Sequence, residues 1–330
     1  MITSLHLAES AVGAFFAARR KLHFKLTCGI AALAVLAGTA TAQTIPFKSV
    51  PIREGSQPFA ITMGEDGNFW FTLSNGGKVA RSTPRGVISY FTTPSLSDPA
   101  FITPGPDGNI WFGEGSTGKI ASVTPDGVIT EHQFSFFGVS VGITTGPDDN
   151  IWFTDQTDHA VWRYELSTGR FTEFRTPTPN SFPGDITTGS DGNMWFTETN
   201  NKFGRITPQG VITEFTGVNS PASITAGPDG NIWIASAFVP QVARINPTTI
   251  DITIFPTPAT PTMIRPGNAN NLLFTEFSAN KIASITTDGV VTESPEFVNS
   301  APEGITAGVA SRVWFLGVGT NRVYRTVVPR

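Results

Sequence analysis

The chain has 330 residues, with 22 Lys and Arg against 26 Asp and Glu, for a formal net charge of −4 at neutral pH. This mildly acidic balance, with no basic run beyond the first 42 residues, argues against nucleic acid as a partner. The single cysteine is Cys28, so no disulfide can form within the chain.

Residues 1–42 have the pattern of a secretory signal peptide. A basic region that ends at Lys25 precedes the apolar run Leu26 to Leu36, and Ala40-Thr41-Ala42 provides a small-residue exit. The apolar run is shorter than the about 20 residues that span a membrane, although an uncleaved anchor is the alternative. We expect cleavage after Ala42, a periplasmic or secreted product without membrane attachment, and one domain over residues 43–330.

A motif that begins as Gly105-Pro106-Asp107-Gly108-Asn109 and ends in an aromatic pair recurs along the chain. Aligned on its tryptophan, the seven copies fall at Trp70, Trp111, Trp152, Trp195, Trp233, Leu273 and Trp314. The successive steps are 41, 41, 43, 38, 40 and 41 residues. Seven copies at a period near forty residues indicate a repeat architecture that occupies the whole chain after the leader.

Each repeat is predicted to contain four short strands. In the second repeat these are 101–103, 110–113, 119–123 and 128–132, with Gly, Pro or Asp at each join. No segment has a helical period. A four-stranded sheet cannot cover both of its own faces, whereas seven arranged radially cover one another. The pattern therefore predicts an all-β, seven-bladed β-propeller of four-stranded antiparallel blades, with the repeated aromatic residues packed between blades.

The last repeat lacks a fourth strand before the chain ends, and an extra strand-like segment, Ile45 to Ile52, precedes the first repeat. We therefore expect the N-terminal strand to complete the last blade and close the ring.

The residue that closes the second strand is acidic in four repeats. These residues are Glu114, Asp155, Glu198 and Glu276. On the same face we expect Asp185 and Glu303 near the start of their innermost strands, and Arg265 where the other repeats carry threonine. Such carboxylates could hold Mg²⁺. Alternatively, they pair with the lysines that open the third strand, which are Lys78, Lys119, Lys202 and Lys281.

Only two histidines follow the leader, His132 and His159. We expect His132 at the end of an outermost strand, away from the channel. His159 lies four residues after Asp155 on the expected ligand face, where it could act as a general acid or base. A solvated loop histidine is the alternative interpretation.

Repeats of the form ITxGPDGNIWFTE, NKIxRIT and PDGVITEF resemble those of the virginiamycin B lyase (streptogramin lyase) family over all seven units. The resemblance implies a Mg²⁺-assisted carbon–oxygen lyase that linearises streptogramin B antibiotics and so gives antibiotic resistance. It implies a metal-binding role for Glu276, and a catalytic histidine shortly after the strand-two acid of a late blade. Here Phe277 and Ser278 follow Glu276 instead.

Two functions follow from these observations. The first is a streptogramin-lyase-like enzyme, with Mg²⁺ held by Glu276 and the other strand-two acids, and His159 or a carboxylate as the base. Arg265, Asp185, Glu303 and Ser278 would surround the ligand. The second is a non-catalytic propeller that binds a small molecule, a glycan or a protein. In either case we expect a monomer.

Overall fold

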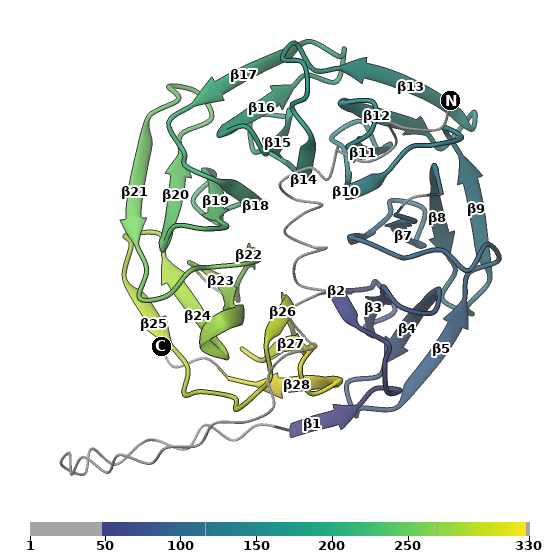
Figure 1. Cartoon of the computed structure of the whole chain (residues 1–330), viewed down its shortest axis with the longest axis vertical. Helices are drawn as coiled ribbons and strands as arrows, with labels where there is room; N and C mark the ends of the chain where they lie inside the picture. The colour runs from purple at the N-terminus through teal and green to yellow at the C-terminus, as the bar shows by residue number, and fades with distance from the viewer. Residues whose placement is uncertain (1–47, 116, 269, 328–330) are drawn as a thin grey trace, which may run out of the picture.

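The computed structural model describes residues 48–115, 117–268 and 270–327, and these form seven four-stranded antiparallel sheets around a central axis (Figure 1). The expected seven-bladed β-propeller is confirmed. The predicted signal peptide lies outside the described residues. Among the described residues, no helix is long and apolar enough to cross a membrane.

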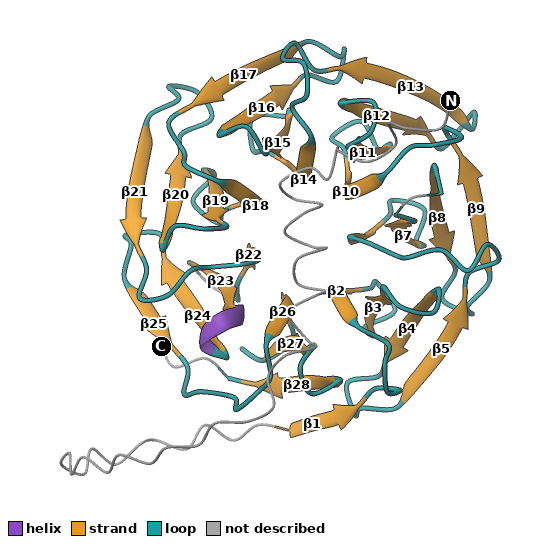
Figure 2. Ribbon diagram, in the orientation of Figure 1, coloured by secondary structure: helices purple, strands orange, loops and turns teal. Residues whose placement is uncertain are grey.

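The strands run from the innermost to the outermost position in blades 1 to 6 (Figure 2). Blades 1 to 3 contain β2 (Pro58–Met63), β3 (Phe69–Leu73), β4 (Lys78–Ser82) and β5 (Ile88–Thr92); β6 (Ile102–Pro104), β7 (Ile110–Gly113), β8 (Lys119–Val123) and β9 (Ile129–Gln133); and β10 (Ser140–Thr145), β11 (Ile151–Asp155), β12 (Ala160–Glu165) and β13 (Arg170–Arg175).

Blades 4 to 6 contain β14 (Pro183–Thr188), β15 (Met194–Glu198), β16 (Lys202–Ile206) and β17 (Ile212–Thr216); β18 (Pro221–Ala226), β19 (Ile232–Ser236), β20 (Gln241–Ile245) and β21 (Ile252–Pro256); and β22 (Ile264–Pro266), β23 (Asn271–Glu276), β24 (Lys281–Thr286) and β25 (Val291–Glu293). A 3-10 turn, η1 (Phe277–Ala279), joins β23 to β24.

The seventh blade joins the two ends of the described chain. It contains β26 (Pro302–Ala307), β27 (Val313–Gly317) and β28 (Arg322–Thr326), and its outermost strand is β1 (Lys48–Pro51). β1 pairs antiparallel with β28, with Lys48 opposite Arg325 and Pro51 opposite Arg322. The Arg322 Nε also donates to the Ser49 hydroxyl at 2.8 Å. The predicted closure by the N-terminal strand is therefore confirmed over Lys48–Pro51, and residues 45–47 of the predicted segment lie outside the described residues.

The repeated motif builds the turn between the first and second strands of a blade. In blade 2 the Asp107 carboxylate accepts the Trp111 indole N–H at 3.0 Å and the backbone N–H of Asn109 at 3.2 Å. The same Asp-to-Trp bond recurs in the other four well-preserved copies. A Cβ on Gly105 would lie 2.4 Å from the Trp111 ring, so this position requires glycine. The motif therefore fixes the turn in each blade, and its aspartate is hydrogen-bonded within the motif itself.

Neighbouring blades are joined by a threonine near the end of the second strand. The Thr197 hydroxyl accepts the Asp185 backbone N–H within blade 4 at 3.1 Å and donates to the Ala222 carbonyl of blade 5 at 3.1 Å. Thr154 and Thr275 make the equivalent bonds at their own blade boundaries. These bonds hold adjacent innermost strands at a fixed separation around the channel.

Arginines on the third strand form a second set of inter-blade contacts. The Arg205 guanidinium lies over Trp195 and Phe215, and its Nη1 donates to the Pro247 carbonyl of blade 5 at 3.4 Å. The arginines Arg81, Arg163, Arg244 and Arg325 make the same kind of contact to the next blade. Because the tryptophans lie beneath these cations and are 0–4% exposed, their predicted packing role is confirmed.

At the boundary between blades 2 and 3, His132 packs on the tryptophan in place of an arginine. Its ring stacks on Trp111 with centroids 5.0 Å apart, and its Nδ1 lies 3.0 Å from the Tyr164 hydroxyl. Burial lowers the pKa of His132, which favours the neutral ring in this aromatic cluster. As expected, His132 lies on an outermost strand, β9.

Candidate functional site

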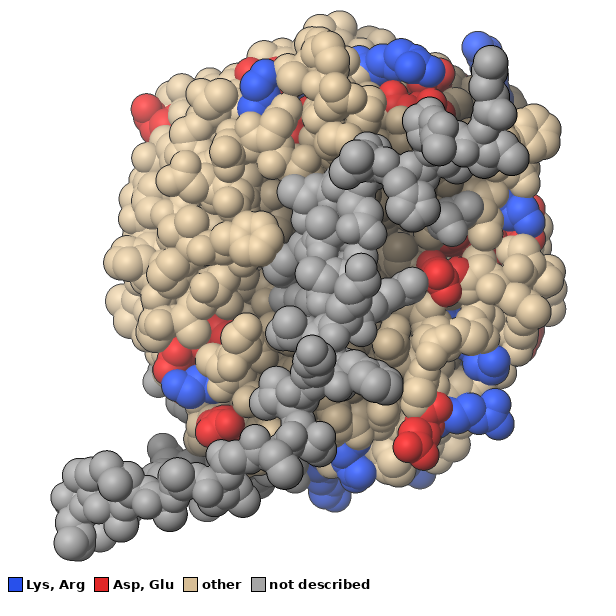
Figure 3. Space-filling view, in the orientation of Figure 1, with Lys and Arg blue, Asp and Glu red and all other residues tan. Residues whose placement is uncertain are grey.

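One face of the ring carries the ends of the second strands, the hairpins that follow them and the links from one blade to the next. We call it the upper face; Figure 3 shows the charges on one face of the molecule. A pocket on the upper face opens to solvent and is lined by residues of blades 2 to 7. Its apolar wall includes Phe101, Val141, Met263 and Phe238. Phe238, in the β19–β20 hairpin, is 63% exposed.

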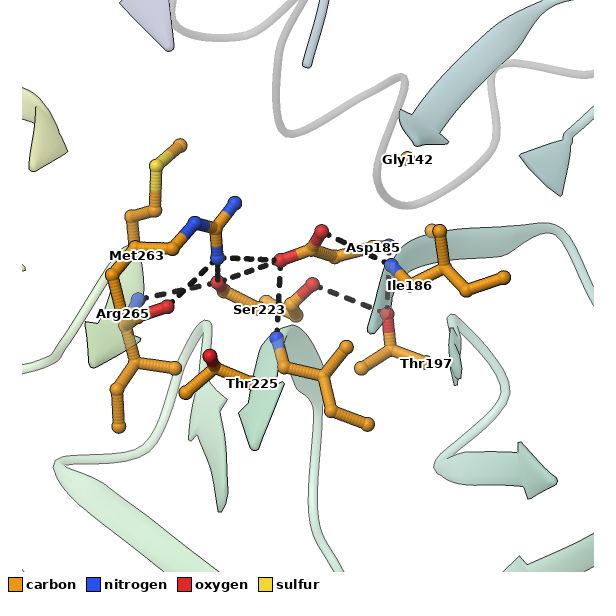
Figure 4. Close-up of polar contacts among 12 residues, drawn as sticks. Gly142, Asp185, Ile186, Thr197, Ser223, Thr225, Met263 and Arg265 are labelled. Carbon is orange, nitrogen blue, oxygen red and sulfur yellow. Dashed lines mark hydrogen bonds and ion pairs between the residues drawn. The ribbon is translucent and has the colours of Figure 1, made fainter. Parts of the chain in front are cut away.

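Two polar residues of the pocket lining, Asp185 and Ser223, contact Arg265, which lies beside the pocket and forms an ion pair between blades 4 and 6. The Arg265 Nη1 donates to the Asp185 Oδ2 at 2.9 Å, to the Ser223 hydroxyl at 3.0 Å and to its neighbouring Ile264 carbonyl at 2.7 Å (Figure 4). Ser223 in turn donates to the Asp185 Oδ2 at 2.8 Å. One side chain from each of three consecutive blades therefore meets at this point.

A bulge in the innermost strand of blade 4 aims Asp185 at this site. The pairing of β14 with β15 shifts register between Pro183 and Ile186, and the Asp185 Oδ1 accepts the Ile186 N–H at 3.0 Å. The adjacent blade must approach closely, because a Cβ on Gly142 would lie 2.5 Å from the Gly184 carbonyl oxygen. Asp185 is 3% exposed, and both of its carboxylate oxygens accept hydrogen bonds.

The four strand-two acids do not converge on the pocket. Glu114, Asp155, Glu198 and Glu276 are 0% exposed, and each lies within its own blade. Within the residues that the structure describes, no group of three or more His, Cys, Asp or Glu side chains could hold a metal ion. The acids are spread around the ring.

The glutamates of blades 2, 4 and 6 share one local arrangement. In blade 4, Glu198 lies opposite Lys202 in the strand pairing, and the Lys202 ammonium makes its ion pair with the strand-four Glu214 at 2.8 Å. Lys119 pairs with Glu131 at 2.6 Å, and Lys281 pairs with Glu293 at 2.6 Å. The expected partners of these lysines were the strand-two acids, and that expectation is wrong. Lys78, in a blade without such an acid, donates to the Gly76 carbonyl.

Burial makes these acids unusually weak. It raises the pKa of Glu114, Glu198 and Glu276 to about 7, with a further rise from the strand-four glutamate of the same blade. Burial also raises the pKa of Asp155 to about 6, although the Val139 and Thr157 backbone N–H groups each donate to it at 2.9 Å and oppose the rise. By contrast, hydrogen bonds from Lys202 and Thr178 outweigh burial and hold the pKa of Glu214 below its usual range.

Glu276 and Glu293 are the carboxyl neighbours that a magnesium ion would use in blade 6. Together they supply two carboxyl groups, whereas Mg²⁺ binds ligands in an octahedral arrangement. Lys281 already forms an ion pair with Glu293. The same arrangement in blades 2 and 4 marks it as a property of the repeat. These residues fit a lysine-neutralised acid pair better than a magnesium centre.

The remaining predicted site residues occupy different places. Glu303, on β26, lines the pocket at 4% exposure. Ser278 is exposed on η1 and does not line the pocket. His159 is half-buried in the β11–β12 hairpin with a φ of 53°, and its ring meets the edge of Phe182 at 4.5 Å between centroids. It also lies outside the pocket lining.

Sequence reasoning missed Ser223, Phe101 and Phe238. Ser223 occupies the position before the repeated isoleucine of the innermost strand, where blade 4 has Asp185. Comparison of that position across the repeats would have shown two polar residues in adjacent blades.

The fold is a seven-bladed β-propeller with a pocket on its upper face that residues of six blades line. A profile of the Virginiamycin B lyase family matches residues 43–217 and 215–329, and the chain belongs to this family. No curated protein sequence matches it.

Solved structures of family members are similar over nearly the whole ring. The virginiamycin B lyase from Staphylococcus aureus is 30% identical with a TM-score of 0.80, covering 86% of this chain and 100% of that one. A catalytically inactive histidine-to-alanine variant of that lyase, with quinupristin, has the same values. The extracellular domain of a hybrid two-component system from B. thetaiotaomicron is 14% identical with a TM-score of 0.66, covering 86% of this chain and 42% of that one. It shares the fold alone.

Proposed function

We propose that this protein is an exported, non-catalytic member of the family that binds a small molecule in the upper-face pocket. The observation that carries this proposal is the pocket itself, which has an apolar wall beside the Asp185–Arg265–Ser223 cluster. Small-molecule sites typically combine an apolar lining with a few convergent polar groups.

The chemistry of the lining favours binding over elimination. An elimination needs a base within hydrogen-bond reach of the proton it removes. No histidine is among the described residues that line the pocket. The Asp185 Oδ2 already accepts three hydrogen bonds, from Arg265, Ser223 and the Ile224 backbone N–H. These three donors occupy Oδ2, so this atom holds the cluster together.

Binding can be tested with 4-phenylbutyramide, a neutral probe with an apolar body. We expect measurable binding by calorimetry or ligand-detected NMR, weakened at least threefold by Phe238→Ala, because that substitution removes part of the apolar wall. Ser278→Ala is the matched control, since Ser278 is exposed outside the pocket. Equal binding by wild type and Phe238→Ala, or none by either, would contradict the proposal.

A second candidate function is a streptogramin-type carbon–oxygen lyase, which the match to the staphylococcal lyases favours. Glu276, with Mg²⁺, and His159 would be its site residues. Incubation of the protein with quinupristin, with and without Mg²⁺, distinguishes the two functions. Linearisation that is abolished in Glu276→Ala would refute the binding-only proposal, whereas an unchanged antibiotic would refute the lyase.

A further inference from the structure

Within the part of the chain that the structure describes, Arg265 uses only one of its three guanidinium nitrogens for hydrogen bonds. Its Nη1 makes the bonds to Asp185, Ser223 and the Ile264 carbonyl. Among the described residues, Nε and Nη2 make no hydrogen bond, and in Figure 4 they lie on the side away from Ser223. The side chain is 22% exposed, so the unused edge is accessible.

The surroundings hold this edge in a fixed orientation. The Arg265 guanidinium carbon lies 5.4 Å from the centroid of the Phe101 ring, and Phe101 also lines the pocket. On the opposite side, Asp185 anchors Nη1 from a buried position. A planar cation fixed by a ring and an ion pair loses little side-chain freedom when it binds a ligand.

The charges near Arg265 decide what its edge can recognise. Asp185 neutralises the cation overall, but its Oδ2 is saturated by three donors and is not available to a ligand. The unused Nε and Nη2 hydrogens form a fork that matches the two oxygens of a carboxylate. The Glu303 carboxyl also lines the pocket. When ionised it works against an anion, so an acid must gain its affinity from this fork.

We propose that Arg265 is the anchor for a small-molecule carboxylic acid, whose carboxylate meets the Nε–Nη2 edge while its apolar body lies along Phe101 and Met263. This inference rests on the proposed binding function and names the ligand class of that pocket, which Arg265 borders through its contacts to Asp185, Ser223 and Phe101. At this position of the innermost strand, blades 1 to 5 and blade 7 carry threonine, so the fork is specific to one side of the channel.

The test uses three probes of one shape that differ only in their polar group: 4-phenylbutyrate, 4-phenylbutyramide and 4-phenylbutylamine. Affinities are measured by calorimetry at pH 7 with the chain purified after leader removal. The acid is expected to bind at least tenfold more tightly than the amide, and the amine more weakly than the amide. Glu303→Gln is expected to strengthen binding of the acid alone.

Arg265→Lys keeps the positive charge beside Asp185 but removes the fork. It is expected to lower the affinity for the acid about tenfold and to leave that for the amide within twofold, with an unchanged melting temperature as evidence of folding. Thr225→Ser, at the equivalent position of blade 5, is the control. If the amide binds and the acid binds no better, the anchoring role of Arg265 is refuted, but the proposed binding function is not. If no probe binds, the anchor and the proposed function both fail.

Discussion

Glu198 at the end of β15 provides a direct test of how the strand-two acids are accommodated. Its side chain is 0% exposed, and neither carboxylate oxygen has a hydrogen-bond partner of ordinary geometry. Burial, together with the charge of Glu214, raises its pKa from 4.5 to about 7, against weaker opposing contributions from Ser181 and Lys202. We therefore predict that Glu198→Gln becomes progressively more stable than the wild type as the pH rises.

The size of this effect follows from the two pKa values. Below about pH 4.5 the acid is protonated in both the folded and the unfolded chain, so ionisation costs nothing. Between about pH 4.5 and 7 only the unfolded chain ionises, and the wild type loses stability as the pH rises. Above pH 7 the loss is complete, on the order of 3 kcal/mol. For a domain of this size that corresponds to about 5 °C in melting temperature.

The assay is thermal unfolding of wild type and Glu198→Gln between pH 4.5 and 8.5. Because the amide is neutral throughout, its own packing cost shifts the melting temperature equally at every pH. The difference between the two proteins should therefore grow between pH 4.5 and 7 and then remain constant. Glu54→Gln, at an exposed position, is the control and should show no such growth. A melting-temperature difference between wild type and Glu198→Gln that does not change with pH would refute the raised pKa of Glu198.

Two further predictions concern the ring. Deletion of the chain through Pro51 removes β1 and exposes the edge of β28. We expect the melting temperature to fall by at least 10 °C. An unchanged melting temperature would show that ring closure by β1 contributes little to stability. Arg205→Met keeps the apolar stem but loses the cation over Trp195 and the hydrogen bond to the Pro247 carbonyl. We expect the free energy of unfolding, measured with denaturant, to fall by about 1–2 kcal/mol. Arg85→Met, on an exposed turn, is the control and should change it by less than about 0.5 kcal/mol.

The sequence by itself determined the ring. The spacing of Trp70 to Trp314 gives seven units, and the turn residues around Asp107 place a hairpin in each. The missing fourth strand of the last repeat could be assigned to the N-terminal segment. These features are local or periodic, so the chemistry of a single repeat, counted along the chain, is sufficient to predict them.

Only the tertiary structure decided where the acids point. Side chains alternate along a strand, so Glu198 shares a face with Phe196 while Trp195 and Thr197 share the other. That face is covered by the neighbouring blade, so Glu198 is fully buried, whereas Lys202 and Glu214 form their ion pair in a partly exposed position. The alternation is visible in the sequence, but the cover that buries the acid comes from residues of other strands.

The pocket was even less accessible to sequence reasoning. Asp185 and Arg265 are 80 residues apart, and each was singled out without any indication that they pair. Their contact depends on the separation of blades 4 and 6 around the channel and on the bulge that turns Asp185 toward Ser223. Sequence spacing sets the number of blades, but the packing of one blade on the next sets which side chains meet above the channel.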